Sequence, residues 1–410
     1  MNSGRLGVAV IGAGMAGRSH AAGYRSATTC YDAGLPQIDL VAIADVNQTF
    51  AEQTARRFGY ARTESSWEAI AEAPDVDVVS VVVANQLHRE VVLGLLSAGK
   101  HVLCEKPLAP TITDAKAMVA AAAAAPHLHT GVGFTYRRSP ALAAIKQRVD
   151  RGEMGRILHF NGHYWCDYAC DPNGPMSWRY KGGPGSGALA DIGSHLVDLA
   201  EFLGGPIESV RGAVLSTFIT ERARPVGAAV GHGAAELSDV MEPVENEDLV
   251  TFSACFASGA TATISASRVA VGMANALGLE LFAEHAAATF DLDRAGEFSY
   301  FDRAVTDETA GYRTVPVGPR HPYVTGGFPM DFPGVGYGQN DLFVFQARAF
   351  LEQVAGLDRL PRVPSFEHGL RNLRILAASA ESARSGGAEV NVGGQPHPPN
   401  PAAASVVRRS

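Results

Sequence analysis

Two short groups of residues in this sequence carry side chains suited to acid–base chemistry. Lys106, in Glu105-Lys106-Pro107, directly follows an apolar run, so its amine would lie at a strand end, where it can hydrogen-bond a hydroxyl and favour its deprotonated form. Asp191 and His195 are four residues apart, which makes them neighbours on one helix face. A histidine there can take a proton while the carboxylate orients it. A strand-ending Lys-Pro pair and a surface ion pair are the plain structural alternatives.

A glycine-rich turn, Gly12-Ala13-Gly14-Met15-Ala16-Gly17, follows a β-branched run and precedes a helical segment at 15–27. In such a strand–turn–helix, the first glycine permits the tight turn, the second lets backbone approach a diphosphate, and the third lets the helix pack on its strand. The N–H groups of Met15, Ala16 and Gly17, at the positive end of the helix, would hold the phosphates. This context predicts a dinucleotide site.

Residues after two later strands would reach the same ligand. Asp45 ends a strand at 38–44, and its carboxylate would accept from the adenosine ribose hydroxyls; a simple strand-end turn residue is the alternative. Neither Val46 nor Asn47 supplies a cation for a 2′-phosphate, so the sequence favours NAD over NADP. Asn85 and His88 follow a buried strand, at the edge where doubly wound sheets bind ligands. Helix capping by Asn85 and a surface position for His88 remain equally open.

The order of the expected elements indicates an α/β protein with two domains. Over 1–134, strands alternate with helices, which predicts a Rossmann domain with a doubly wound parallel sheet. Over 135–390, alternating strands predict an α+β domain with a large, open, mostly antiparallel sheet for substrate binding and oligomerisation. Within it, an amphipathic helix from Leu189 to Leu203 would carry Asp191 and His195. The Pro/Ala-rich segment 391–410 is predicted to be a disordered or arm-like tail.

Composition excludes several functional classes. The 410 residues are 46% hydrophobic, and their net charge of −8 suggests neither a nucleic-acid partner nor an anionic membrane. The sequence shows no signal peptide and no apolar run of membrane-spanning length, and its five scattered cysteines fit a reducing, cytoplasmic compartment. Cys166 and Cys170 stand near His163, but no fourth ligand and no paired Cys-x-x-Cys spacing follows, so no metal site is predicted.

The combination Gly12-x-Gly14-x-x-Gly17, Glu105-Lys106-Pro107 and Asp191-x-x-x-His195 resembles the Gfo/Idh/MocA oxidoreductases, the glucose–fructose oxidoreductase and inositol dehydrogenase family. The resemblance extends over the chain to about Arg384. Further stretches resemble the branch of levoglucosan dehydrogenases and related glycoside dehydrogenases, which oxidise a pyranose ring hydroxyl, commonly at C3. They are Arg137–Pro140, Asp171–Arg179 and Gly334–Gly338.

The resemblance implies residue roles. Lys106 would be the catalytic lysine, His195 the acid/base and Asp191 its helper at the substrate. The residues implied in cofactor binding are Gly12, Gly14, Met15, Ala16, Gly17, Asp45, Asn85, His88, Glu105, Lys106, Trp178 and Arg179. The residues implied in substrate binding are Lys106, Tyr164, Asp167, Asp191, His195 and Tyr337. The glycine-rich stretch 182–187 adds to this expectation, because it would bring backbone close to another group.

The function expected from this resemblance is an NAD-dependent sugar dehydrogenase that oxidises a secondary ring hydroxyl of a pyranose or anhydrosugar such as levoglucosan. It would work as a homodimer or homotetramer. An inositol, cyclitol or aminosugar dehydrogenase and a 3-keto-sugar reductase are the alternatives within enzymes. A non-catalytic NAD(H) sensor is disfavoured, since it would not need Lys106, Asp191 and His195 together.

Overall fold

The computed structural model describes residues 4–30, 34–226, 236–325, 328–330 and 332–393. The tail expected at 391–410 therefore lies outside the described residues from 394 onward. Every described helix is too short or too polar to cross a lipid bilayer.

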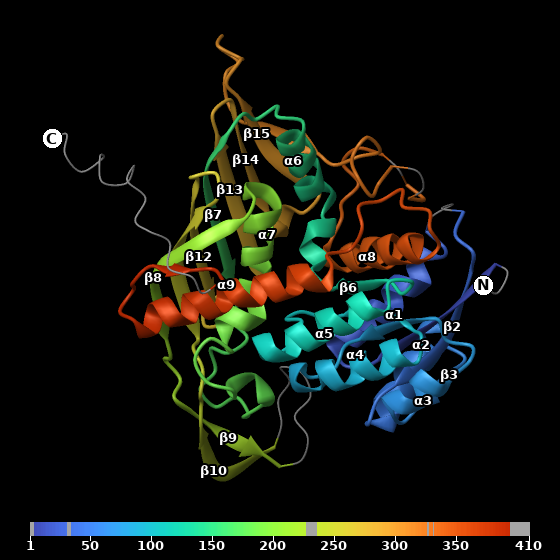
Figure 1. Ribbon diagram of the computed structural model, residues 1–410. Helices are drawn as coiled ribbons and strands as arrows, with labels where there is room; N and C mark the ends of the chain where they lie inside the picture. The colour runs from blue at the N-terminus through green and yellow to red at the C-terminus, as the bar shows by residue number, and fades with distance from the viewer. Residues whose placement is uncertain (1–3, 31–33, 227–235, 326–327, 331, 394–410) are drawn as a thin grey trace.

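The N-terminal part forms a six-stranded parallel sheet in the order β3-β2-β1-β4-β5-β6, which confirms the predicted doubly wound sheet (Figure 1). Its strands, rich in buried β-branched residues, are β1 (Arg5–Ile11), β2 (Gln37–Ala44), β3 (Arg62–Glu64), β4 (Val78–Val81), β5 (His101–Cys104) and β6 (Thr130–Val132). Strand order reverses between β1 and β4, and ligands of such sheets bind outside the carboxyl ends of the strands at this point.

Helices cover both faces of this sheet, as expected for parallel crossovers. They are α1 (Met15–Ala27), α2 (Gln48–Phe58), α3 (Trp67–Glu72), α4 (His88–Ser97) and α5 (Ile112–Ala124). Side chains cap three of them: Asn47 accepts from Phe50 N, Ser66 from Ala69 N and Thr111 from Asp114 N. Gly59, with a φ of 75°, ends α2 in the left-handed region.

The second sheet has nine strands in the order β16-β15-β14-β13-β7-β12-β11-β8-β17. Among the described strands of this second sheet, only the β7–β12 pair is parallel, so the sheet is mixed but mostly antiparallel, as predicted. The strands are β7 (Ile157–Trp165), β8 (Ile207–Ser216), β11 (Leu249–Phe256), β12 (Thr261–Ser267), β13 (Ala276–Ala283), β14 (Ala286–Asp291), β15 (Glu297–Asp302), β16 (Arg313–Pro316) and β17 (Val390–Asn391). A separate hairpin of β9 (Glu221–Pro225) and β10 (Leu237–Pro243) projects from the body (Figure 1).

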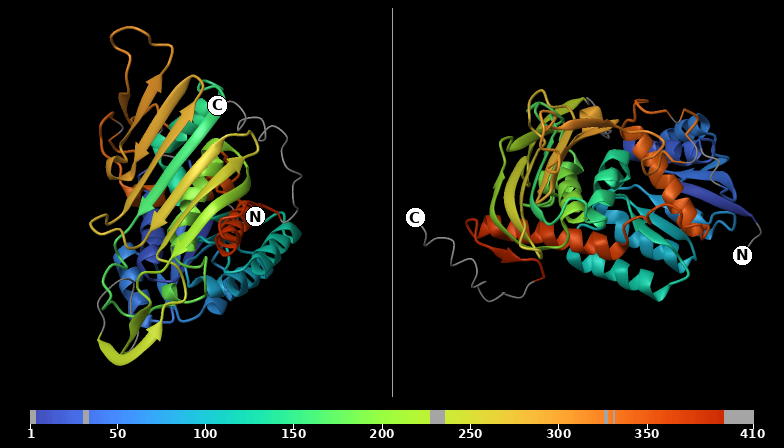
Figure 2. Two further views of the ribbon diagram at one scale, coloured as in Figure 1. Left: turned by 90° about the vertical axis from the view of Figure 1, so that its left-hand side faces the viewer. Right: turned by 90° about the horizontal axis from the view of Figure 1, so that it is seen from above.

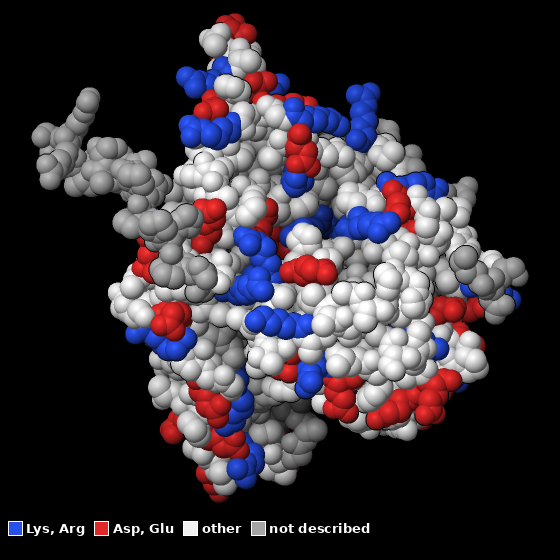
Figure 3. Space-filling model, viewed as in Figure 1, with Lys and Arg blue, Asp and Glu red and all other residues white. Residues whose placement is uncertain are grey.

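Helices cover only one face of the second sheet. Helices α6 (Pro140–Asp150) and α7 (Ser194–Gly204) pack on that face, while Figure 2 (left) shows the opposite face without a helix. The burial pattern agrees, because buried and half-buried residues alternate along β11. On the face of the molecule shown in Figure 3, basic and acidic side chains are interspersed.

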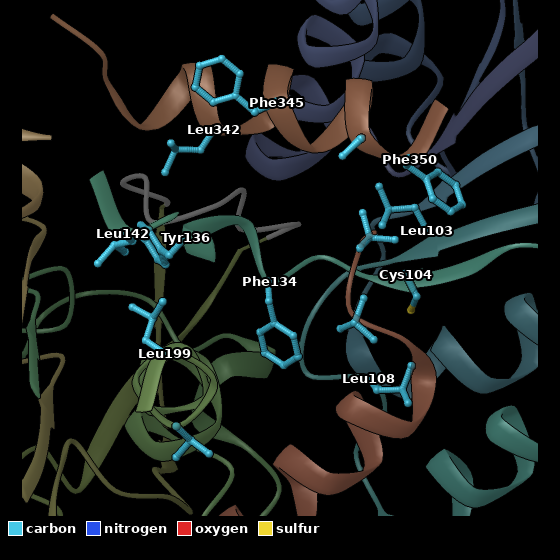
Figure 4. Packing of buried hydrophobic residues seen from close by; sticks show 14 of the residues in the cluster. Leu103, Cys104, Leu108, Phe134, Tyr136, Leu142, Leu199, Leu342, Phe345 and Phe350 are labelled. Atoms are coloured by element: carbon cyan, nitrogen blue, oxygen red, sulfur yellow. The ribbon is translucent and has the colours of Figure 1, made fainter. Parts of the chain in front are cut away.

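Two C-terminal helices join the halves into one core. Helix α8 (Gln339–Val354) crosses α1 so closely that a Cβ on Gly23 would lie 2.7 Å from the Phe343 carbonyl oxygen. Helix α9 (Phe366–Arg384) packs on α5 and β6 and also on β8. Figure 4 shows α8 side chains Leu342, Phe345 and Phe350 near buried residues of both halves. The division at 134/135 therefore stays a prediction, since α8 packs on α1 and on the 3₁₀ turn Thr135–Arg138, and α9 packs on a strand of each sheet.

Candidate active site

The glycine-rich turn lies at the carboxyl end of β1, and two of its glycines are required by close backbone contacts. Gly12 has a φ of +102°, and a Cβ there would lie 2.1 Å from the Val82 carbonyl oxygen. A Cβ on Gly17 would lie 1.8 Å from the Gly12 carbonyl oxygen. A Cβ on Gly14 would meet nothing within 4 Å, so the space beside the middle of the turn is open.

The N-terminus of α1 offers free donors at this turn. Gly14 is the N-cap and supplies no side-chain cap, and the first helical turn, which begins Met15-Ala16-Gly17, contains no acidic residue. The N–H groups at a helix start have no partner within the helix and lie at its positive end. The turn and this helix end thus fit the diphosphate of a dinucleotide.

Asp45 lies at the end of β2, against the turn. Its Oδ2 accepts from Ala13 N at 2.6 Å, and its Oδ1 accepts from Asn47 N at 2.7 Å. The turn-residue interpretation of Asp45 is therefore realised, and it is compatible with ribose binding because each carboxylate oxygen can accept a second hydrogen bond.

A cavity of about 330 Å³ next to the turn is lined in part by arginine side chains that the sequence analysis missed. Its lining residues are Ala13, Arg18, Phe50, Gln53, Thr54, Arg56 and Arg57. The sequence analysis considered only Val46 and Asn47 as positions for a cation that could face a 2′-phosphate. The helical spacing of Phe50, Gln53, Thr54 and Arg57 on α2 is the signal that could have found this face.

His88 follows β4, as the sequence analysis predicted, but it is buried rather than at the surface. Asn85 begins a 3₁₀ turn (Asn85–Leu87) after β4 and is half-buried, whereas His88 has no exposed surface. Nδ1 of His88 lies 3.1 Å from the Pro107 carbonyl oxygen, and its Nε2 lies 3.1 Å from that of Val83. Burial lowers the pKa of His88. This residue is therefore not a surface histidine; it ties the end of β4 to the segment after Lys106, and its cofactor contact stays a prediction.

Lys106 follows β5 directly, and the Lys106–Pro107 peptide bond is cis. Lys106 Nζ donates to the Asp191 carbonyl oxygen at 2.7 Å and to Asp191 Oδ1 at 3.3 Å. The carboxylate of Glu105 points elsewhere: Oε1 lies 2.9 Å from His20 Nε2, and Oε2 accepts from Lys106 N at 3.2 Å. Protein groups engage both oxygens once, and each can accept a second hydrogen bond, so the expected cofactor contact of Glu105 stays a prediction.

The helix that carries Asp191 and His195 differs from the continuous α-helix that was expected. Leu189–Gly193 is π-helical and leads into α7. The Asp191 carboxylate contacts Lys106 and also accepts from the Tyr168 hydroxyl at 2.8 Å, rather than contacting the His195 ring. Burial alone would raise the pKa of Asp191, but the charges of Lys106 and Arg179 and the Tyr168 hydroxyl hold it well below its usual value.

The glycine-rich stretch before this helix approaches a protein carboxylate rather than a ligand. Glu247, just before β11, accepts from Gly185 N at 2.7 Å through Oε2 and from Leu189 N at 2.9 Å through Oε1. A Cβ on Gly187 would lie 2.2 Å from the Glu247 carbonyl oxygen. Glu247 therefore holds the start of the π-helical turn, a contact between segments about sixty residues apart in sequence.

His195 lies in an aromatic pocket, with 8% of its surface exposed. Its ring centroid is 4.7 Å from that of Tyr136, 6.2 Å from Tyr164 and 6.4 Å from Phe134. Among the described residues, neither ring nitrogen has a hydrogen-bond partner, and Nδ1 is buried. Burial and the Lys106 charge lower the pKa of His195 well below its usual range, so the imidazole is neutral at pH 7.

Four side chains behind His195 form a closed hydrogen-bonded ring. Tyr136 donates to the Tyr164 hydroxyl at 2.6 Å, which donates to Asn275 Oδ1 at 2.8 Å. Asn275 Nδ2 donates to Gln339 Oε1 at 2.7 Å, and Gln339 Nε2 donates to Tyr136 at 2.9 Å. A cavity of about 360 Å³ lies beside Asn275 and Gln339. The sequence analysis found only Tyr164, because the other three come from unrelated segments without a motif.

The other residues predicted for the site are Trp178, Arg179, Asp167 and Tyr337. Arg179 lies close enough to Asp191 to lower its pKa, and its guanidinium stacks 4.6 Å over the ring of Trp178, which is 42% exposed. Asp167 is half-buried, beside the site-lining Cys166. The ring of Tyr337 packs on Phe328 and on Phe345 of α8. No group of three or more His, Cys, Asp or Glu side chains is arranged to hold a metal ion in the described part of the chain.

Comparison with known proteins places this site in a family. Residues 6–134 match the family model for the Gfo/Idh/MocA oxidoreductase family with an NAD-binding Rossmann fold, and residues 142–289 match the model for its C-terminal domain. The chain is 37% identical to levoglucosan dehydrogenase of Pseudarthrobacter phenanthrenivorans, over 92% of this chain and 96% of that protein. It is 30% identical to glucose-6-phosphate 3-dehydrogenase of Bacillus subtilis, over 53% of this chain and 56% of that protein.

The fold agrees with solved structures. A structure of levoglucosan dehydrogenase in complex with NADH superimposes with a TM-score of 0.85 at 34% identity, covering 95% of this chain and 99% of that one. The complex of that enzyme with NADH and levoglucosan matches equally, with a TM-score of 0.85. The chain therefore belongs to the Gfo/Idh/MocA family of NAD-binding oxidoreductases.

Proposed function

We propose that this chain is an NAD-dependent dehydrogenase that oxidises a secondary ring hydroxyl, at C3, of a pyranose or anhydrosugar such as levoglucosan. One observation carries the proposal. Lys106 Nζ, at the end of a strand of the dinucleotide-binding sheet, contacts Asp191 on the helical segment that also carries His195. A cation and a neutral base are thus held at the junction of the two halves.

His195 acts as the general base. A neutral imidazole can accept the hydroxyl proton directly, and the lowered pKa of His195 keeps it neutral at working pH. The rings of Phe134, Tyr136 and Tyr164 fix its position. A base of this kind contributes about 10²–10⁴-fold to the rate.

Lys106 stabilises the developing alkoxide. Its ammonium lies in a partly water-excluded site, where a positive charge is worth more than in solution. Asp191 holds this ammonium through its backbone oxygen and its carboxylate, and Tyr168 holds the carboxylate. Bound NAD⁺ supplies the hydride acceptor; the residues that would hold it are Gly12, Gly14, Met15, Ala16, Gly17, Asp45, Asn85, Trp178 and Arg179.

The substrate class follows from the surroundings of these two groups and from relatives. Tyr164, Asp167 and the amides of Asn275 and Gln339 offer donors and acceptors suited to a hydroxyl-rich ring. A 37% identical relative is named for levoglucosan, and another is named for oxidation at position 3 of a glucose ring.

We also propose that copies assemble as homodimers or homotetramers through the helix-free face of the second sheet, and that the enzyme works in the cytoplasm.

The test is NAD⁺ and NADP⁺ reduction against levoglucosan, glucose, alkyl glucosides, myo- and scyllo-inositol and aminoglycosides. We expect NAD⁺ reduction with a pyranose or anhydrosugar, lost in Lys106→Ala and kept in the control Lys116→Ala, an exposed lysine on α5. NMR of the product would locate the keto group, and light scattering would give the oligomeric state. Activity only with inositols, or none despite NAD binding, would contradict the proposal.

A further inference from the structure

A buried chain of hydrogen-bonded polar side chains lies between α1 and the N-terminal sheet, next to Lys106, and has no part in the mechanism above. The Tyr24 hydroxyl of α1 lies 2.9 Å from Ser80 Oγ of β4. Ser80 Oγ lies 3.0 Å from His20 Nδ1, and His20 Nε2 lies 2.9 Å from Glu105 Oε1. Tyr24 and Ser80 have no exposed surface, and His20 has 3%. Because unsatisfied polar groups are costly in such a place, the direction of each hydrogen bond is constrained.

The two ends of this hydrogen-bonded chain, Tyr24 and Glu105, determine which group donates in each hydrogen bond. Burial raises the pKa of Tyr24 far above its usual value, so its phenol keeps its proton and donates to Ser80. Burial would raise the pKa of Glu105, but its contact with His20, through both the hydrogen bond and electrostatics, and the Lys106 charge lower it, so Glu105 is an ionised acceptor. Ser80 then donates to His20 Nδ1, and the ring carries its proton on Nε2, facing Glu105.

Packing fixes both the imidazole and the carboxylate. The His20 ring meets the edge of Phe343 on α8, with centroids 5.4 Å apart and planes at 64°. Across from His20, a Cβ on Gly133 would lie 2.4 Å from Glu105 Oε1, so only glycine leaves room for the carboxylate there. The second oxygen, Oε2, accepts from the backbone N–H of Lys106. His20 thus fixes a group that touches the Lys106 main chain.

We propose that His20, as the neutral Nε2–H tautomer, is a positioning residue for Lys106. It holds Glu105, and Glu105 holds the Lys106 backbone in the orientation from which Nζ reaches Asp191. His20 itself touches neither Lys106 Nζ nor Asp191. The kinetic part of this proposal rests on the proposed sugar dehydrogenase activity; the tautomer does not.

Two amide variants of His20 distinguish the role of its Nε2 from the role of its Nδ1. His20→Gln places an amide nitrogen where Nε2 was and keeps a donor to Glu105, whereas His20→Asn reaches only as far as Nδ1 and loses that donor. Because a displacement of about 1 Å at a reacting group can cost about 10²-fold, we expect kcat for sugar oxidation to fall about 10- to 100-fold in His20→Asn. His20→Gln should stay close to wild type, and the KM for NAD⁺ should be unchanged in both. Equal losses in the two folded variants would overturn the positioning role.

A second readout does not depend on activity. Two-bond ¹H–¹⁵N spectra of the histidine rings report the tautomer, and the signal that is missing in His20→Gln identifies His20. We expect the neutral Nε2–H form; an Nδ1–H form or a doubly protonated ring would overturn the proposal. If the wild type oxidises no sugar but His20 shows this tautomer, the proposed function fails while the hydrogen-bond chain stands.

Ser80→Ala provides a further test in case the His20→Asn variant does not fold. It removes the donor to Nδ1 and the acceptor of the Tyr24 hydroxyl, on a fully buried strand residue of nearly the same size. We expect a mixture of His20 tautomers and a kcat reduced several-fold. An unchanged tautomer together with unchanged kcat would show that the chain does not set the state of His20.

Discussion

The two halves of the site are built in different ways. On the dinucleotide side, each group comes from a short stretch at the end of a β-strand: the turn at 12–17 after β1, Asp45 after β2 and Lys106 after β5. On the His195 side, the pocket is assembled from segments far apart in sequence, namely Phe134, Tyr136, Tyr164, Asn275 and Gln339. A local motif can describe the first half, whereas only the tertiary fold creates the second.

The halves also differ in electrostatics. Helix-end N–H groups and exposed arginines make the dinucleotide side attractive to anions. On the His195 side, burial excludes water. This burial keeps His195 neutral and raises the pKa of Cys166 to about 12. Charge is concentrated at the Lys106–Asp191 contact, where the halves meet. Each prediction below changes one half and asks whether the other responds.

The largest effect is expected on the His195 side. His195→Ala removes the general base, so kcat should fall about 10²–10⁴-fold while NAD⁺ binding, measured by calorimetry, is retained. The control is His127→Ala, an exposed histidine outside the site. A His195→Ala enzyme with wild-type turnover would show that another group takes the proton.

Asp191→Asn tests the contact between the halves. The substitution keeps the shape but removes the charge that faces Lys106 at 3.3 Å. A hydrogen bond to a charged group is worth about 1.5–3 kcal/mol, so kcat/KM for the sugar should fall about 10- to 100-fold. Steady-state kinetics with the KM for NAD⁺ as an internal reference would check this, and a loss confined to that KM would contradict it.

Asp45→Asn acts on the dinucleotide side alone. Loss of the charge should raise the KM for NAD⁺ about tenfold, since charge-assisted hydrogen bonds are the stronger ones. It should also improve the relative use of NADP⁺, because Arg18, Arg56 and Arg57 line the neighbouring cavity. The KM for the sugar should not change. A variant that still rejects NADP⁺ as strongly as wild type would place the selectivity elsewhere.

The smallest effect concerns pH. Only neutral His195 can accept the proton, and burial and Lys106 lower its pKa, so the acid limb of kcat should lie below the ordinary histidine value of about 6.5. Activity should therefore persist as the pH falls through that value and decline only at lower pH. A pH–rate profile measures this directly, and an acid limb above pH 7 would contradict the assigned state of the ring.

The same contrast explains how far the sequence could predict the structure. The bounds of α1 and the end of β2 agree with the helix predicted at 15–27 and the strand predicted at 38–44, because the glycine-rich turn and the β-branched run are local signals. The π-helical turn at Leu189–Gly193 could not be predicted, since it is held by Glu247, far along the chain. The burial of His88 could not be predicted for the same reason: the carbonyl groups that its Nδ1 faces belong to Pro107 and Leu108, after Lys106. Tyr337 belonged to a recognised stretch, but its ring packs on α8.

In the proposed mechanism, Lys106 from one half and His195 from the other act on the same hydroxyl group. The most direct test compares kcat for the sugar in Lys106→Ala, His195→Ala and the double variant. Residues that act as a unit are strongly non-additive, so the double variant should lose about as much as the more impaired single variant. Losses that multiply in the double variant would mean that the two residues serve separate steps, and the convergence of the two halves on one hydroxyl would be wrong.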